Sequence, residues 1–253
     1  MSINIQLGKD KFSTFVSILK VFGQQCTDLW IKNGLVCQTS DRRSSIIVSD
    51  LTSLVGDANI LVSNIISKTS LLEPFKKQGT DMDLIIDENM YIFKDSYSAI
   101  EIGVPAERYM QNAFMEDRVL QQKLDINEGE RIFRYEISKF LLDRLTALAN
   151  GLSATMVMVD FIDNKAIFRI SVRNLASPTV GKLITLDELE CPVTGMCTYP
   201  IAPFMLGSDS VDASCYYQNN RQNLILKLDI KIGGLPIIIW CISQLSADSQ
   251  DGE

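Results

Sequence analysis

Histidine is absent from the 253-residue sequence. The chain therefore has no Ser-His or Cys-His nucleophile pair, and it lacks the side chain that most often acts as a general base near neutral pH. No imidazole can complete a common zinc site with Cys191 and Cys197. An enzyme of this composition would have to work with carboxylates, Lys or Tyr alone, so we expect no enzyme, no metal and no other cofactor.

Paired cysteines and long apolar runs are missing as well. The six cysteines include no Cys-x-x-Cys pair and mostly lie among apolar residues, as reduced structural thiols do. No apolar run approaches the roughly 20 residues of a membrane-spanning helix. The first residues, MSINIQLGKD, lack the long apolar core of a signal peptide. These absences predict a soluble, intracellular protein without a membrane partner.

Basic residues are outnumbered, with 24 Lys and Arg against 31 Asp and Glu and a net charge of −7. This balance argues against a protein that coats nucleic acid with its whole surface, but it allows a local basic face. Hydrophobic residues make up 46% of the chain. That content is enough to bury a core in each of two domains.

One helical segment occurs twice. KDKFSTFVSILKVFG covers residues 9–23 and ISKFLLDRLTALANG covers residues 137–151, each with Lys-Phe near its start and Gly at its end. The Lys-Phe pairs begin at 11 and 139 and the glycines lie at 23 and 151, so both are 128 residues apart. Apolar runs around a tight turn follow each copy, at Asn33-Gly34 and at Asp163-Asn164. The repetition predicts a duplicated domain.

The two halves also continue alike. Residues 59–79 indicate a strand that runs into a helix, which Pro74 is expected to kink or end, and residues 81–104 indicate three strands. In the second half, MCTYPIAPFMLGS is typical of a strand with a shorter helical segment, and three strands follow. We predict an α+β fold with domains at 1–108 and 131–246, a surface connector at 109–130 and an acidic, disordered tail at 247–253.

Helical periodicity separates an apolar stripe from a basic one in both copies. The expected buried residues are Phe12, Phe15, Val16, Leu19 and Phe22 in the first copy and Ile137, Leu141, Leu145 and Leu148 in the second. Basic side chains gather on the helices at Lys9, Lys11, Lys20, Lys68, Lys76, Lys77, Lys139 and Arg144. These could be ordinary solvated residues. As a set they favour phosphate contact, and the lack of aromatic residues among them favours duplex over single-stranded DNA.

These features together resemble the DNA sliding clamps, the family of proliferating cell nuclear antigen and the phage-type processivity factors. The resemblance rests on the tandem β-α-β-β-β order, the connector, the basic helices and the acidic total. The stretches that carry it are LVCQTSDRRSSIIVSDL, LVSNIISKTSLL and SKFLLDRLTALANGLSATMVMVDFIDNKAIF.

The resemblance implies two tandem clamp-type domains, each a duplicated β-α-β-β-β unit, with helices inside and antiparallel sheets outside. Three subunits would close into a ring around double-stranded DNA, contacting it without reading its sequence. The ring would act as a processivity factor that tethers DNA polymerase and other replication proteins, and a clamp loader would place it on DNA. It would work with the replication machinery, in the cytoplasm or nucleus of its host or in a virus or phage.

The resemblance also assigns two protein surfaces. Short apolar peptides of partner proteins would dock at Ser40, Ser44, Ile47, Val119, Leu120, Leu124, Ile242 and Leu245. Ring closure would join a strand that holds Ala99, Ile100, Ile102 and Val104 to a strand of the next subunit that holds Val180, Lys182 and Ile184. Cys241-Ile242 stands where the family usually has Ala-Pro, so the form of the docking peptide is expected to differ.

Two alternatives stay open. One is a clamp-like chain that remains monomeric and serves as an adaptor in replication or transcription. The other is an enzyme or small-ligand protein that uses the carboxylates of Asp81, Asp83, Asp87 and Glu88. Those acids alternate with apolar residues, which a solvated strand face also produces.

Overall fold

The computed structural model describes residues 3–87, 90–104, 114–162, 165–172, 179–184, 195–206, 210–219 and 223–243. The chain forms two compact units. Unit 1 comprises Met1–Glu116 and Lys231–Ile237, and unit 2 comprises Asp117–Ile230 and Ile238–Glu253. The tip of the C-terminal hairpin therefore groups with the first half of the chain.

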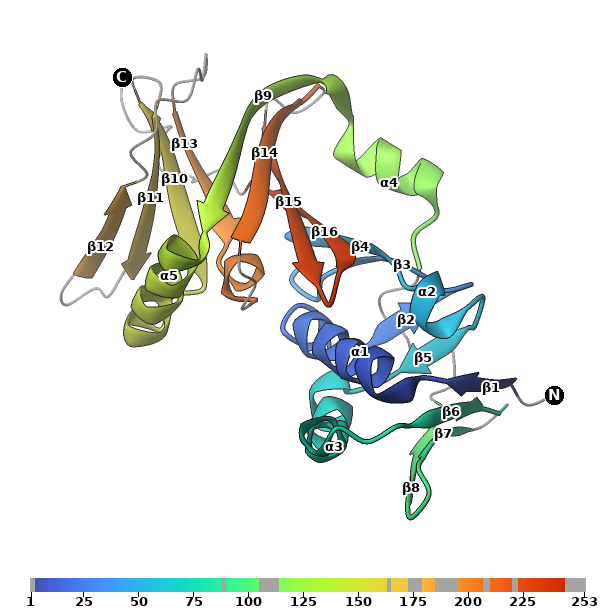
Figure 1. Cartoon of the computed structure of the whole chain (residues 1–253). Coiled ribbons are helices and arrows are strands. Elements are labelled where there is room, and N and C mark those ends of the chain that lie inside the picture. Colours follow the sequence, from blue (N-terminus) through green and yellow to red (C-terminus); the bar gives the residue numbers. More distant parts are fainter. Residues whose placement is uncertain are drawn as a thin grey trace. The chain divides into compact units, whose positions relative to one another are not determined.

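The first repeat follows a β-α-β-β-β pattern twice, with one short extra helix, α2 (Figure 1). Its elements are β1 (Ile3–Gln6), α1 (Gly8–Gly23), β2 (Leu29–Ile31), β3 (Leu35–Thr39), β4 (Ser45–Asp50), α2 (Thr52–Val55), β5 (Ile60–Val62), α3 (Ile65–Gln78), β6 (Asp83–Ile86), β7 (Met90–Lys94) and β8 (Ala99–Gly103).

The second repeat follows the same pattern after a helix, α4, and a single 3₁₀ turn, η2, takes the place of its second helix. Its elements are α4 (Asp117–Leu124), β9 (Ile126–Ser138), α5 (Lys139–Leu152), β10 (Met156–Ile162), β11 (Lys165–Val172), β12 (Thr179–Ile184), β13 (Gly195–Pro200), η2 (Ala202–Met205), β14 (Ser210–Gln218), β15 (Leu224–Ile232) and β16 (Leu235–Ile242). The predicted α+β class and duplicated unit are confirmed.

Unit 1 packs α1 against an antiparallel sheet of strand order β1-β6-β7-β8. Phe12 and Phe15 of α1 place their rings 6.3 and 6.1 Å from the ring of Phe93 on β7. Strands β3 and β4 form a second layer, and the first residues of β16 lie beside β4, where Ser49 Oγ donates a hydrogen bond to Pro236 O (2.9 Å). Burial of these large aromatic rings is the main stabilising term of the unit.

Unit 2 contains two antiparallel layers, β12-β11-β10-β13 and β16-β15-β14-β9. In one layer Phe168 of β11 meets Phe204 of η2 edge to face, with ring centroids 6.0 Å apart. Tyr199 of β13 is fully buried and donates its hydroxyl to Leu224 O (3.3 Å) on β15. These contacts join the two layers of the unit into one core.

The predicted turn at Asn33-Gly34 is present. Both residues have positive φ angles, 51° and 75°, and the backbones of Lys32 and Leu35 exchange hydrogen bonds of 2.8 and 2.9 Å across the turn. A Cβ on Gly34 would lie 2.3 Å from Gly56 O, so only glycine fits. The other predicted turn, Asp163-Asn164, lies outside the described residues, although β10 and β11 pair up to Ile162 and Lys165 on either side of it.

The predicted connector contains regular structure. Met115 N donates to Cys37 O (2.7 Å), so this end of the connector packs on β3 within unit 1. Helix α4 follows, and its Leu120 and Leu124 are buried. The strand β9 begins at Ile126, before the predicted end of the connector. Residues 105–113 and the predicted acidic tail lie outside the described residues.

The predicted register between the two copies of the repeated helix is wrong by two residues. The predicted offset of 128 pairs Phe12 with Phe140, yet Phe12 is fully buried and Phe140 is 63% exposed. An offset of 130 matches the burial instead, because Phe12 then corresponds to Leu142 and Phe15 to Leu145, all of them buried. The same offset pairs the exposed Lys9 with Lys139.

The predicted buried stripe of the second copy is also partly wrong. Leu145 is buried as expected, but Leu141 and Leu148 are only half-buried, and Leu142 is buried in their place. Ile137 is buried at the end of β9, ahead of the helix. Identical letters at the two ends of the segments suggested a register that core packing does not follow.

Candidate nucleic-acid interface

Helix α1 presents its lysines opposite a continuous apolar stripe. The predicted core residues Phe12, Phe15, Val16, Leu19 and Phe22 are all buried, which confirms the helical periodicity. On the solvent side, Lys9, Lys11 and Lys20 are exposed, with Asp10 as the acid of the first turn. Asp81 Oδ1 accepts a hydrogen bond from Lys9 N (2.6 Å) and so occupies one of the unpaired N–H groups at the start of the helix.

Helix α3 has defined ends. The side chain of Asn64 accepts from Ser67 N (3.4 Å) at the N-terminus, and Gly79, with a φ of 67°, ends the helix in the left-handed region. Lys76 and Lys77 lie in the last turn, where positive charge is favoured by the helix dipole. Of the two outcomes expected at Pro74, a kink or an end of the helix, the end is excluded, because α3 continues past it to Gln78.

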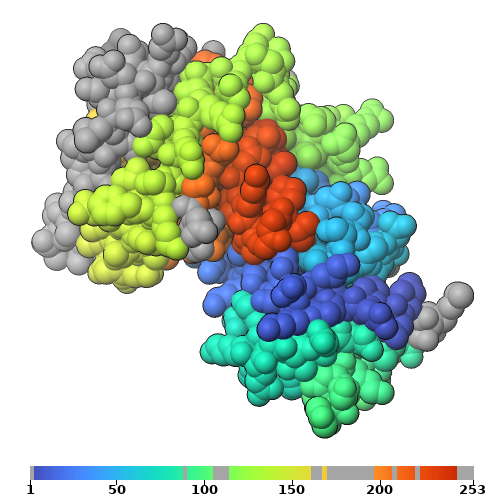
Figure 2. Space-filling view, viewed as in Figure 1, coloured from blue at the N-terminus to red at the C-terminus, as the bar shows by residue number. Residues whose placement is uncertain are grey.

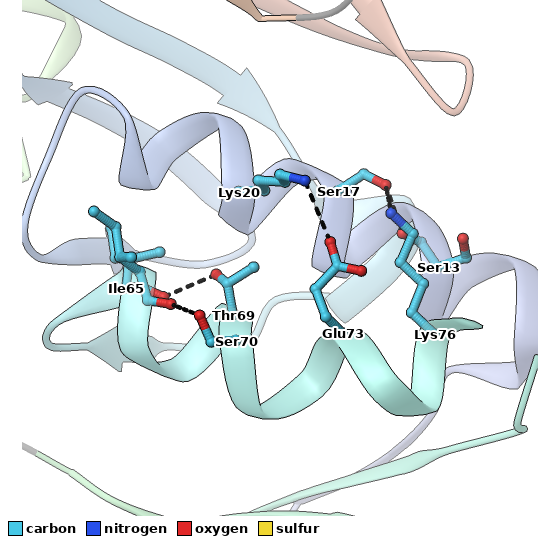
Figure 3. Close-up of polar contacts among 9 residues, drawn as sticks. Ser13, Ser17, Lys20, Ile65, Thr69, Ser70, Glu73 and Lys76 are labelled. Atoms are coloured by element: carbon cyan, nitrogen blue, oxygen red, sulfur yellow. Dashed lines mark hydrogen bonds and ion pairs between the residues drawn. The ribbon is translucent and has the colours of Figure 1, made fainter. Parts of the chain in front are cut away.

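The two helices pack side by side and are joined by polar contacts (Figure 3). Lys76 Nζ donates to Ser17 Oγ (2.9 Å), and Ser17 Oγ donates to Ser13 O (2.9 Å). Lys20 Nζ lies 3.6 Å from Glu73 Oε1. Glu73 also precedes Lys77 by one helical turn, a spacing that favours a pair within α3, yet its carboxylate points to α1 instead.

The structure thus brings the six predicted lysines of the first half onto one pair of packed helices. Residues of α1 and α3 adjoin on the surface of unit 1 (Figure 2). A Cβ on Gly79 would lie 2.8 Å from Lys9 Cε, so the stem of Lys9 crosses the end of α3. Among the described residues, Lys11, Lys68 and Lys77 form no ion pair. Lys68 and Lys76 are half-buried, and the others are exposed.

A hollow of about 410 Å³ lies between the two helices. We call it the α1–α3 hollow; its lining includes Lys20, Gly23, Gln24, Ile66, Glu73 and Lys77. The two ammonium groups and one carboxylate leave it with a net positive charge. Ile66 is exposed in spite of its apolar side chain. Glu73 was not among the predicted site residues, because its partner Lys20 lies on another helix.

Helix α5 of unit 2 carries a mixed surface. Lys139 and Arg144 are exposed beside Asp143. The guanidinium of Arg144 lies over the ring of Phe140, 4.7 Å from its centroid. Phe140 was not among the predicted site residues, and the 128-residue offset would pair it with the buried Phe12. The counterpart of α3, η2, spans four residues, APFM, without a basic residue.

The residues predicted for partner docking in unit 1 are packed. Ser40, Ser44 and Ile47 are all buried, with Ile47 fully so. They flank a turn in which Asp41 accepts hydrogen bonds from Thr27 N (2.7 Å) and Thr27 Oγ1 (2.6 Å). The turn is therefore held in one conformation by its own polar groups.

The docking residues predicted in unit 2 differ in exposure. Val119 of α4 is 41% exposed, whereas Leu120 and Leu124 are buried. Ile242 is half-buried at the end of β16. Leu245 lies outside the described residues. Among the described residues of this group, Val119 thus offers the most apolar surface to a partner.

The predicted subunit contacts fall on two edge strands. Among the described strands, β8 pairs only with β7, and β12 pairs only with β11. Ala99 on β8 is exposed, Ile100 and Val104 are half-buried, and Ile102 is buried. The backbone positions of Val180, Lys182 and Ile184 lie opposite Ser171, Arg169 and Ile167 on β11. Each strand leaves one row of backbone groups without a partner within its sheet.

The four carboxylates considered for chemistry have different surroundings. Asp81 accepts a hydrogen bond at the start of α1, Asp83 is half-buried in β6, Asp87 is exposed, and Glu88 lies outside the described residues. Burial raises the pKa of the Cys26 thiol to about 12, which keeps it in the unreactive thiol form. Within the described ranges no group of three or more acidic or cysteine side chains could hold a metal ion. None of the described helices is long and apolar enough to cross a membrane.

Known proteins match this chain in fold but not in the sequence comparisons. No family model matches the chain, and no curated protein matches it. Among solved structures, proliferating cellular nuclear antigen of Entamoeba histolytica matches with a TM-score of 0.60 and 10% identity, covering 96% of this chain and 98% of that one. A PCNA2–PCNA3 complex of Sulfolobus tokodaii matches with a TM-score of 0.59 and 13% identity, covering 96% and 99%.

A third match is PCNA of A. fulgidus, whose structure includes the C-terminal region of FEN-1. Its TM-score is 0.58 at 10% identity, with 97% of this chain and 100% of that chain covered. All three matches run nearly end to end at an identity too low to carry residue roles. The likeness therefore lies in the order and pairing of the duplicated elements, and the chain has the fold of the DNA sliding clamps.

Proposed function

We propose that this chain is a DNA sliding clamp, a homotrimeric ring that encircles duplex DNA and tethers a DNA polymerase during synthesis. One observation carries the proposal: a chain with the clamp fold and a net charge of −7 gathers six lysines on α1 and α3. Lysine ammonium groups contact phosphates without reading sequence. The acidic remainder of the surface repels DNA from other faces.

The sparse lysines suit sliding better than a fixed grip. At physiological salt their attraction is screened beyond roughly 8 Å. Two of the six are also engaged by protein groups, Lys76 by Ser17 and Lys20 by Glu73. Retention on DNA would therefore come from encirclement, with weak, sequence-independent contacts inside the ring. Helix α5 would contribute less, since Asp143 stands beside its two basic residues.

Self-assembly through β8 and β12 is supported by a pairing inside the chain. Strand β4 holds the same place in the first repeat as β12 in the second, and β16 holds the same place in the second as β8 in the first. Within unit 1, β4 lies beside the start of β16. The same pairing between β12 and the β8 of another subunit would repeat this junction and complete the ring.

Partner proteins would dock through short apolar peptides. The structure of A. fulgidus PCNA with the C-terminal region of FEN-1 motivates this part of the proposal. We assign the docking surface of this chain to α4, where Val119 is exposed. The partners would be DNA polymerase, other replication proteins and a clamp loader. The chain itself would perform no catalysis and need no cofactor, and it would act where DNA is replicated.

The mass in solution tests the ring. Light scattering should give about three times the 28.3 kDa of one chain at micromolar concentration. A stable monomer would contradict the ring and favour the monomeric adaptor instead.

Encirclement has its own test, which needs no loader. The protein is incubated with linear duplex DNA, both ends are then blocked with streptavidin, and the salt concentration is raised. A closed ring stays on the blocked DNA and slides off DNA with open ends. Equal loss from both substrates would overturn the proposal. Stimulation of a polymerase on circular DNA, but not on short open linear DNA, would further exclude the carboxylate enzyme.

A further inference from the structure

The α1–α3 hollow contains a negative charge where the proposed function requires positive ones. Its charged groups are the ammonium groups of Lys20 and Lys77 and the carboxylate of Glu73. Glu73 points across the hollow to Lys20, with Oε1 3.6 Å from Nζ (Figure 3). Thr69 and Ser70 donate their hydroxyls to Ile65 O (2.8 Å) and Ile66 O (2.9 Å) of their own helix. The two ammonium groups therefore supply the charge attraction for an anion here.

The two side chains of the Lys20–Glu73 ion pair differ in solvent exposure. The side chain of Lys20 is 63% exposed, whereas that of Glu73 is only 22% exposed. Lys20 can therefore turn toward solvent or toward an incoming phosphate, while the carboxylate stays in the hollow. A carboxylate and a phosphate present the same kind of oxygen acceptor to a lysine. Glu73 thus occupies the lysine as a phosphate would.

We propose that Glu73 is a built-in competitor for the DNA backbone at this hollow. It holds Lys20 when no phosphate is near, and a phosphate takes its place as the duplex passes. The inference rests on the proposed clamp function and assigns Glu73 a role in regulating it. The ion pair is weak because its N–O distance is 3.6 Å and its Lys20 end is exposed, so a phosphate displaces the carboxylate readily. The displaced carboxylate then remains close to the phosphate, opposes it and shortens its stay.

The consequence is a contact that forms and breaks quickly. With Glu73 present, the hollow has a single net positive charge, which matches one phosphate. Without that carboxylate it would have two, and a phosphate would be held longer. Each subunit of the ring would then bind the DNA backbone more tightly at this point, and the ring would slide more slowly.

The test is isocratic retention on immobilised duplex DNA at fixed low salt, where retention is proportional to the association constant. Glu73→Gln keeps the size of the side chain and removes its charge. We expect its retention to rise about two- to fivefold for each subunit. Asp57→Asn is the matched control, because it removes the same charge from an exposed residue outside the hollow. Its retention should stay close to that of the unchanged chain.

A second pair of variants tests the route through Lys20. In a Lys20→Ala background, Glu73→Gln should lose most of its effect, since the competitor no longer has its lysine. An equal gain with and without Lys20, or equal gains in Glu73→Gln and Asp57→Asn, would overturn the inference. The inference would also be overturned if Glu73→Gln were retained no longer than the parent chain. This holds even when the parent chain stays on end-blocked DNA, as the proposed function requires. If the parent chain were retained neither on immobilised duplex DNA nor on end-blocked DNA, both proposals would be overturned.

Discussion

Lys76 Nζ donates a 2.9 Å hydrogen bond to Ser17 Oγ, and this contact links α3 to α1. Ser17 Oγ in turn donates a hydrogen bond to Ser13 O, so the three groups form a short chain between the helices. Lys77, the next residue, lies in the α1–α3 hollow and is exposed. Two adjacent lysines therefore have different surroundings, although both were predicted to contact phosphates.

Replacing each of these lysines by methionine should separate the two roles. Lys77→Met should leave the unfolding free energy unchanged and reduce the salt dependence of DNA retention by about one unit of slope. Lys76→Met should lower the unfolding free energy by about 0.5–1.5 kcal/mol, because Ser17 loses a charged donor. Urea unfolding and retention on duplex DNA measure the two effects. Indistinguishable behaviour of the two variants would contradict the assignment.

The edge of β8 offers a test of assembly that spares the sheet. Asp95 N donates to Ser98 O (3.0 Å) across the turn between β7 and β8. By the alternation of an antiparallel pair, the N–H of Glu101 then points away from β7. Glu101→Pro should remove a donor from the free edge without breaking the β7–β8 pairing.

We expect Glu101→Pro to remain folded by circular dichroism and to run as a monomer in light scattering. Glu101→Ala keeps the N–H and serves as the control, which should assemble like the unchanged chain. A trimeric Glu101→Pro variant would show that this edge does not join subunits.

Exposure decides which docking residue gives a clean test. Ile47→Ser would place a hydroxyl in a fully buried site and should cost about 2–5 kcal/mol of stability. Val119→Ser alters a residue that is 41% exposed and should change stability by less than about 0.5 kcal/mol. The affinity of the variant for a short apolar peptide, measured with a fluorescent label, should weaken about three- to tenfold. Unchanged peptide binding would remove Val119 from the proposed docking surface.

Local periodicity accounts for the parts of this fold that the sequence could predict. The stripe of Phe12, Phe15 and Leu19 follows from helical spacing, and the Asn33-Gly34 turn follows from residues that accept positive φ. At Pro74 the local rule for proline allowed either a kink or an end of the helix, and the helix continues to Gln78.

The features that sequence reasoning missed depend on what packs against what. The carboxylate of Glu73 has a favourable partner one turn away in its own helix, and only the packing of α3 on α1 directs it to Lys20. The edge status of β8 and β12 came from a family resemblance, since no local pattern marks a strand as unpaired. The predicted register of the repeated helix was wrong for a similar reason. It was based on identical residues at the ends of the two segments, whereas the buried residues determine how the two helices correspond.

That register leads to a direct stability test in α5. With an offset of 130, Leu142 takes the core position of Phe12, and with an offset of 128, Phe140 would take it. Leu142 is 4% exposed, so Leu142→Ala should cost about 2–5 kcal/mol of unfolding free energy. Phe140→Ala removes a mostly exposed ring that only stacks on Arg144, so it should cost about 1 kcal/mol or less. Urea unfolding of the two variants measures the difference. A larger loss for Phe140→Ala would restore the register that the letters suggested, and it would place Lys139 where Lys11, rather than Lys9, stands in α1.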